Sequence, residues 1–207
     1  MTVATADGRA FCDHLDYVAQ DFGRYDGQGN AAGLHTRTWD QSRLDIVSDI
    51  AAIPEPDGSY DAILCTEVFE HLPEPLAALR EFSRLLKPGG YLILTAPFCS
   101  LTHFAPFHYA TGFSRYYYDT HLPAHGFDVV DVQENGNFFE FLAQETRRLR
   151  GVAARYAGGA FTPDEQAAVH TLLGALHRFS ANDTGSKELL HFGFHVLARK
   201  ASPISKD

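Results

Sequence analysis

The sequence has few cysteines, few basic residues and no long apolar run. Its 207 residues include three Cys, one Met and one Trp, and 17 Lys and Arg stand against 26 Asp and Glu, a formal net charge of −9. Because affinity for nucleic-acid phosphates comes from Lys and Arg, this balance argues against a broad nucleic-acid-binding surface. No apolar stretch is long enough to cross a bilayer, and no basic start followed by an apolar run marks a signal peptide. We therefore expect neither a nucleic-acid nor a membrane partner.

The cysteines do not form a disulfide framework. Cys12, Cys65 and Cys99 include no CxxC pair, which is typical of reduced thiols in a cytoplasmic protein. The remaining composition, 45% hydrophobic and 21% charged, is that of a soluble globular protein. A single domain over residues 1–207 is the simplest interpretation of this length.

The stretch 60–97 carries the clearest pattern of secondary structure. Tyr60–Cys65 is short and mostly apolar, as expected for a strand buried on both faces. Pro75 suits the first turn of a helix whose apolar residues fall on one face and which should end at Lys87. Pro88-Gly89-Gly90 stops that helix before a second strand, Tyr91–Thr95. The order predicts a parallel strand–helix–strand unit.

This stretch also resembles a known family over about forty residues. The runs that carry the resemblance are YDAILCTEVFEHL and LAALREFSRLLKPGGYLILTAP. They are similar to the fourth strand, its helix and the fifth strand of class I S-adenosylmethionine-dependent methyltransferases of the type 11 group. Weaker resemblance runs from Tyr17 to about Phe127. It implies an α/β fold, a doubly wound Rossmann-like sheet with an antiparallel last strand. It also implies S-adenosylmethionine as cofactor and a methyl acceptor that the residues do not identify, with a small molecule or a sugar among the candidates.

One element of the family is not found near the start of the sequence. In the family, a first strand and a Gly-x-Gly loop precede the second strand, and the glycines let the backbone approach the cofactor closely. Residues 1–15, MTVATADGRAFCDHL, contain a single glycine, Gly8, and no apolar run typical of a buried strand. Either the sequence starts late or the loop has degenerated, and we favour the late start. We therefore expect the first strand of the sheet to be missing.

Two acids at predicted strand ends are candidates for cofactor binding. Asp21 closes a strand beginning at Tyr17, and ligands of doubly wound sheets lie at such carboxyl ends, where an acid can accept hydrogen bonds from ribose hydroxyls. Asp49 closes the next strand, which begins at Leu44. The resemblance implies that Asp49 accepts from the adenine amino group and that the Ile50 N–H meets a ring nitrogen. For both acids, capping of the following turn is the alternative interpretation.

The loop TEVFEHL after the strand at 60–65 is the third candidate segment. The resemblance places the cofactor against it, with Thr66 and Glu67 nearest. Glu70 and His71 could instead fix the loop for the following helix, which is the interpretation we favour for Glu70 and leave open for His71.

Histidines supply the candidate general bases. His103 and His108 lie in the aromatic run FCSLTHFAPFHYATGF, where the family faces its methyl acceptor. With His71 they are candidates for removing a proton from an acceptor, because an imidazole titrates near neutral pH. They could equally be hydrogen-bond donors in a packed loop. A metal site at His103 and His108 lacks a third ligand at recognisable spacing, so we expect no metal.

Two predicted helices precede the last strand. Phe138–Ala154 shows helical spacing of apolar residues, and Thr162-Pro163-Asp164-Glu165 forms a capping box that starts the second helix. Residues 136–181 are therefore predicted to be a helical insertion, which could be a lid or the interface of a homodimer. The last strand is predicted at Leu189–Ala198.

Two other functions remain open at this point. A non-catalytic or truncated methyltransferase-like binding domain would explain the missing glycine loop. A nicotinamide oxidoreductase would need GxGxxG after the first strand, and the sequence shows none.

Overall fold

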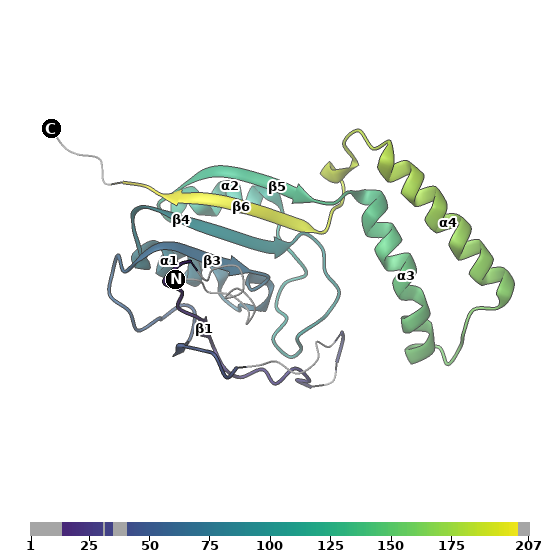
Figure 1. Cartoon of the computed structure of the whole chain (residues 1–207), viewed down its shortest axis with the longest axis horizontal. Coiled ribbons are helices and arrows are strands. Elements are labelled where there is room, and N and C mark those ends of the chain that lie inside the picture. The colour runs from purple at the N-terminus through teal and green to yellow at the C-terminus, as the bar shows by residue number, and fades with distance from the viewer. Residues whose placement is uncertain (1–13, 31, 35–40, 203–207) are drawn as a thin grey trace. The chain divides into compact units, whose positions relative to one another are not determined.

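The computed structural model describes residues 14–30, 32–34 and 41–202 (Figure 1). These residues fall into two compact units. The sheet unit comprises the described chain up to Gln133 and from Gly193 onward, and the helical unit comprises Glu134–Phe192. Residues 1–15, where the family's glycine loop would lie, are almost entirely outside the described residues.

A four-stranded sheet is the centre of the sheet unit. Its order is β3-β4-β6-β5. The strands are β3 (Tyr60–Thr66), β4 (Leu86–Pro97), β5 (Phe127–Asn135) and β6 (Gly193–Lys200). β3 and β4 pair in parallel, whereas β6 pairs antiparallel to β4. This confirms the predicted α/β fold with an antiparallel last strand.

A second, two-stranded sheet holds the earlier part of the chain. β1 (Gln20–Asp21) pairs in parallel with β2 (Ile46–Val47). Both lie inside the strands predicted from the sequence, but each is only two residues long. Within the described ranges, no strand joins this pair to β3. The described strands therefore form two separate sheets.

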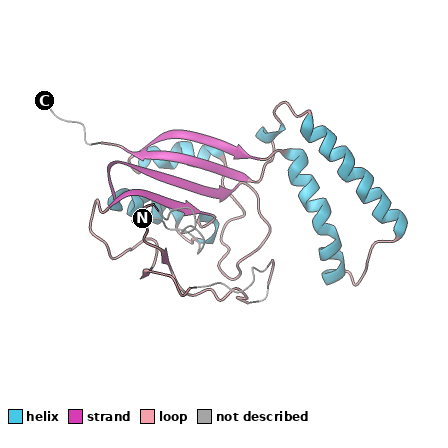
Figure 2. Cartoon of the chain, viewed as in Figure 1, coloured by secondary structure: helices cyan, strands magenta, loops and turns pink. Residues whose placement is uncertain are grey.

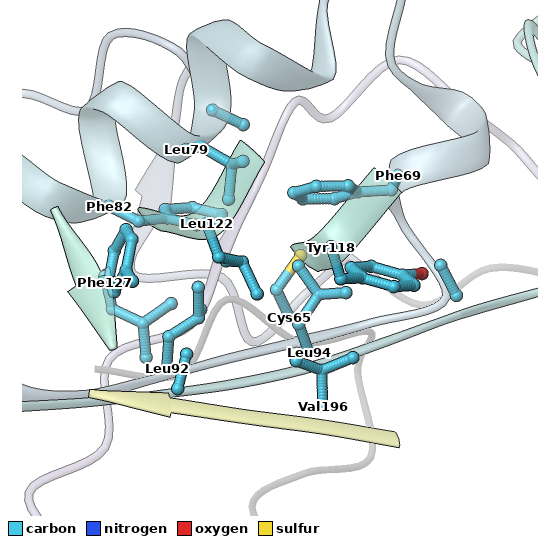
Figure 3. Close-up of a cluster of buried hydrophobic side chains, with 14 of the residues drawn as sticks. Cys65, Phe69, Leu79, Phe82, Leu92, Leu94, Tyr118, Leu122, Phe127 and Val196 are labelled. Atoms are coloured by element: carbon cyan, nitrogen blue, oxygen red, sulfur yellow. The ribbon is translucent and has the colours of Figure 1, made fainter. Parts of the chain in front are cut away.

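Two helices, α1 (Pro75–Leu85) and α2 (Arg115–Ala124), cover one face of the four-stranded sheet (Figure 1). The close-up in Figure 3 shows their apolar side chains above those of the strands. Because side chains alternate along a strand, Leu92 and Leu94 are fully buried on this face, while Tyr91 and Ile93 are 44% and 42% exposed on the other. The hydrophobic core therefore lies on one side of the sheet.

The end of α1 differs from the prediction. The helix ends at Leu85, two residues before Lys87, and Leu86 already pairs with Tyr60 as the first residue of β4. The Pro-Gly-Gly segment forms an irregularity inside the strand, where Gly89 has a φ of +80°. Strand pairing at Leu86 has overridden the helical spacing that continued past it.

The helical unit consists of two long helices, α3 (Phe138–Tyr156) and α4 (Pro163–Ala181) (Figure 2). Asn137 caps α3 by accepting from two backbone N–H groups, and Thr162 and Glu165 form the predicted capping box of α4. The Phe192 N–H donates to the Asn135 carbonyl at 2.9 Å, so the two ends of the unit meet. A groove of about 720 Å³ is lined by residues of both helices and by Phe192.

The start of the last strand was predicted wrongly. β6 begins at Gly193 rather than Leu189, because Ser186–Glu188 forms a short 3-10 helix and the chain turns before it enters the sheet. Phe194, Val196 and Ala198 do share the buried face, as predicted. None of the helices in the described chain is both long and apolar enough to span a membrane.

Candidate functional site

Two loops meet at the carboxyl edge of the parallel strands. The first follows β3 and contains a short 3-10 helix, η2 (Phe69–His71). The second, residues 98–113, follows β4. The backbone N–H groups of Tyr109 and Ala110 both donate to the Glu70 carbonyl, at 2.8 and 3.2 Å. These bonds fold the second loop over the first.

The segment after β1 packs against the second loop. Asn30 N–H donates to the Ala105 carbonyl at 3.2 Å, and Leu34 N–H donates to the Thr102 carbonyl at 2.9 Å. Gly29 has a φ of +55°, and a Cβ there would collide with the Ala105 carbonyl oxygen, so this approach requires glycine. Segments following β1, β3 and β4 are thereby brought together, as expected for the ligand-binding edge of an α/β sheet.

Glu67 is held in an unusual conformation at the end of β3. Its φ is +52°, rare for a residue with a side chain, and its N–H donates to the Thr95 carbonyl at 2.8 Å. The Thr95 hydroxyl donates to Glu67 Oε1 at 2.8 Å. Desolvation and the nearby Glu70 carboxylate raise the pKa of Glu67, although its side chain still reaches solvent. Thr66 is the last residue of β3, directly before this turn.

Asp21 stands at the end of β1, where the sequence placed it. Its Oδ1 accepts from the Gly23 N–H at 2.7 Å, so the carboxylate also caps the following turn. Burial raises the pKa of Asp21 despite this bond. The capping and ligand-binding interpretations are compatible, because one carboxylate can accept several hydrogen bonds.

Asp49 and Ile50 follow β2. Asp49 is exposed, and its Oδ1 accepts from the Ala51 N–H at 2.9 Å, which is the capping role considered as its alternative. Ile50 is buried among the core residues. No hydrogen bond or ring contact recorded for the described residues links either of them to the two loops that follow β3 and β4.

The three candidate histidines belong to the loops after β3 and β4 and lie close together. The ring centroids of His71 and His103 are 4.7 Å apart, and those of His103 and His108 are 4.9 Å apart. Burial lowers the pKa of His71 and of His108. His103 differs, because its interaction with Glu70 raises the pKa of its imidazole.

Glu70 was expected to fix the loop, and its carbonyl does accept the two bonds from Tyr109 and Ala110. Its contact with the histidines was not predicted: the side chain is fully buried, and Oε1 is 3.6 Å from the Nε2 atoms of both His71 and His103. Neither carboxylate oxygen accepts a hydrogen bond from the part of the chain that the structure describes. The one signal in the sequence was its position beside His71.

A comparison with known families identifies the segment that carries the first of these loops. Residues 15–94 match the sequence model of the family described as "Methyltransferase domain". The match covers less than half of the chain, and this segment is similar to methyltransferase domains. The match includes β1, β2, β3 and most of β4, and so it covers Asp21, Asp49, Ile50, Thr66, Glu67 and His71. His103 and His108 lie beyond it.

Curated relatives match a shorter stretch of this chain. A "Ubiquinone biosynthesis O-methyltransferase" of Xanthomonas oryzae pv. oryzae is 46% identical over 63 residues, 30% of this chain and 26% of the relative. The protein of the same name from Xanthomonas campestris pv. campestris is 51% identical over 53 residues, 26% of this chain and 21% of the relative. The matched part thus spans about a quarter of these relatives.

Solved structures support the fold over more of the chain. A SAM-dependent methyltransferase from Archaeoglobus fulgidus aligns with a TM-score of 0.53 at 13% identity, covering 92% of this chain and 80% of that one. The YcgJ protein of Bacillus subtilis aligns with a TM-score of 0.52 at 12% identity, covering 98% and 90%. At these identities the likeness is one of fold.

Proposed function

We propose that this chain binds S-adenosylmethionine and takes part in methyl transfer to a small-molecule acceptor. The observation that carries the proposal is the family match over residues 15–94, whose strands end at the edge where three loop segments meet. When bound, the cofactor supplies a methyl group activated on a positively charged sulfur. The chain would then have to hold the cofactor and align an acceptor with it.

The chemistry of the strand-end residues fits this cofactor. Asp21 is the last residue of β1 and Asp49 follows β2, and carboxylates accept from ribose hydroxyls and from an adenine amino group. Thr66 and Glu67 follow at the end of β3. We assign Asp21 and Asp49, with the Ile50 N–H, to the adenosine part, and Thr66 and Glu67 to the loop beside it.

The histidine cluster is suited to an acceptor that must lose a proton. His71 and His108, whose pKa values are lowered by burial, are neutral at pH 7 and can accept a proton from a hydroxyl. The small-molecule acceptor class is supported by the printed names of the Xanthomonas relatives, which are O-methyltransferases. The His103 ring contacts both of the others, at centroid distances of 4.7 and 4.9 Å, and is the third candidate base.

Calorimetric titration of the purified chain with S-adenosylhomocysteine tests cofactor binding. Asp21→Asn retains an oxygen for the Gly23 N–H and replaces one acceptor with a donor. We expect it to weaken binding by about 10- to 100-fold, since an unmade hydrogen bond to a charged group costs about 1.5–3 kcal/mol. Asp128→Asn, on β5, is the matched control and should bind as the wild type does.

The outcomes separate the two interpretations of the domain. Equal affinity of Asp21→Asn and the wild type would contradict the role assigned to Asp21. A folded wild-type chain that shows no binding would favour the non-catalytic, methyltransferase-like binding domain.

A further inference from the structure

Three side chains from the two loops converge on one point. Glu70, His71 and His103 each offer a ligand atom, and these atoms all lie within 4.8 Å of one another. Glu70 Oε1 is 3.6 Å from the Nε2 atom of each histidine. From this arrangement we propose a binding site for one divalent transition-metal ion, with Zn²⁺ as the ion that best fits the ligands.

The other ring nitrogens fix the orientation of both histidines. His71 Nδ1 is 2.6 Å from the Phe107 carbonyl oxygen, and His103 Nδ1 is 2.9 Å from the Leu101 carbonyl oxygen. A nitrogen that faces a carbonyl must donate, which places the proton of a neutral ring on Nδ1 and the lone pair on Nε2. Metal-binding histidines commonly have this arrangement, with one nitrogen on the ion and the other held by a carbonyl.

The buried carboxylate lacks any other compensation among the described residues. Glu70 is fully buried and accepts no hydrogen bond there, and 3.6 Å is too long for one from either histidine. An unpaired charge in such a place is costly, and a cation between the three ligands would remove that cost. The distances leave room for an ion, since zinc lies about 2.0–2.2 Å from nitrogen and oxygen ligands.

The donor set favours zinc over magnesium or calcium. Mg²⁺ and Ca²⁺ select oxygen ligands, whereas two imidazole nitrogens with one carboxylate are a common set for Zn²⁺. Three protein ligands leave the fourth tetrahedral position open. From the sequence we predicted no metal, because His103 and His108 have no third ligand at recognisable spacing. The fold supplies Glu70 and His71 from the other loop instead, and His108 turns its Nε2 toward Ser100 Oγ at 3.3 Å.

Metal binding by the full chain, treated first with chelator, tests this site. We expect calorimetry to show one Zn²⁺ per chain, Co²⁺ to give the visible absorption of a tetrahedral ion, and Mg²⁺ to show no binding at the same concentrations. Glu70→Gln, His71→Ala and His103→Ala should each weaken Zn²⁺ binding by at least about 100-fold, since changes in residues that merely orient ligands already cost 10- to 100-fold. His195→Ala, an exposed histidine on β6, is the control and should bind normally.

A stability readout guards against variants that fail to fold. Zn²⁺ should raise the Tm of the wild type and of His195→Ala but not that of His103→Ala, which removes a half-buried side chain and should keep the fold. Glu70→Gln without metal should be at least as stable as the wild type, because it removes a buried charge.

Two results would overturn the proposal. One is the absence of stoichiometric Zn²⁺ binding. A protonated His103 beside Glu70, seen by NMR, would then identify the cluster as an imidazolium–carboxylate pair. The other is Zn²⁺ binding that Glu70→Gln and His103→Ala leave unchanged. The proposal does not depend on the cofactor, so titration with S-adenosylhomocysteine reports separately on the proposed function. With the ion bound, the Nε2 lone pair of His71 is occupied, and His108 is then the candidate base that does not bind the ion.

Discussion

The sheet unit and the helical unit bury their apolar side chains to very different extents. In the sheet unit, apolar residues of both the strands and the covering helices, such as Ile63, Phe82 and Leu94, are fully buried. In the described helical unit, only Ala143 and Leu176 are buried apolar residues. Its helices instead expose several large apolar side chains, namely Leu142, Leu149, Val152, Leu172 and Phe179.

This difference indicates two sources of stability. The sheet unit is held by close packing, which places the carboxyl-edge loops on a rigid base. The helical unit depends more on local bonds, such as the Asn137 cap, the capping box at Thr162 and the hydrogen bond from Asn137 Nδ2 to Ser180 Oγ at 3.0 Å. Substitutions should therefore have large effects in the first unit and modest, local effects in the second.

The largest effect is expected from Leu94→Ala in the centre of β4. Leu94 is fully buried, so the change leaves a cavity and should lower the free energy of unfolding by about 2–5 kcal/mol. Leu172→Ala on α4 is the matched control, and we expect it to cost less than about 1 kcal/mol because this leucine is exposed. Urea denaturation with hydrogen exchange resolved by segment would measure both. Equal losses would show that the two units do not differ as their burial indicates.

An intermediate, pH-dependent effect is expected at Glu81 on α1. Arg84 donates to both Glu81 oxygens and to the Ile53 carbonyl, and Glu81 accepts from the Ile53 N–H. These bonds hold the pKa of Glu81 below 4.5, and the hydrogen bond with Arg84 contributes most to this lowering. Because the folded-state pKa is lowered, this stabilisation is present at neutral pH and is lost as the pH falls below about 4.5.

Glu81→Gln should therefore cost about 1–3 kcal/mol at pH 7 and less at pH 3, which urea denaturation at the two pH values would show. Glu188→Gln, an exposed residue of the helical unit, is the control. A Glu81→Gln cost that does not change between pH 7 and pH 3 would contradict the assigned ionic role.

The smallest effect is expected from Thr162→Ala at the start of α4. The Thr162 side chain accepts from the Glu165 N–H and the Glu165 side chain accepts from the Thr162 N–H, so the change breaks a reciprocal cap worth about 1 kcal/mol. Faster hydrogen exchange confined to α4 would confirm it. Thr171→Ala, within the same helix, should have no such effect, since alanine is the better helix former there. Faster exchange throughout the sheet unit would contradict the local character of this effect.

The sequence predicted the elements that depend on local patterns. The strand at Tyr60, the proline start of α1 and the capping box at Thr162 all follow from residues close together in the chain, and all are confirmed. The start of β6 was missed because the alternating run LLHFGF does not show where the chain turns into the sheet. The approach of His103 to Glu70 could not be predicted, because it depends on the loop after β4 folding over the loop after β3.

The hydrogen bond between Phe192 and Asn135 also bears on the entropy of the chain. β6 cannot pair with β4 until everything between them has closed into a loop, and the entropic cost of closure grows with the length of flexible chain. Each doubling of a flexible loop costs about 0.6 kcal/mol, and a folded insertion whose ends meet adds hardly any flexible length. Once α3 and α4 have formed, the whole stretch Glu134–Phe192 acts on the sheet as a short turn would. The chain can therefore carry these two helices ahead of its last strand at almost no cost to the pairing of that strand.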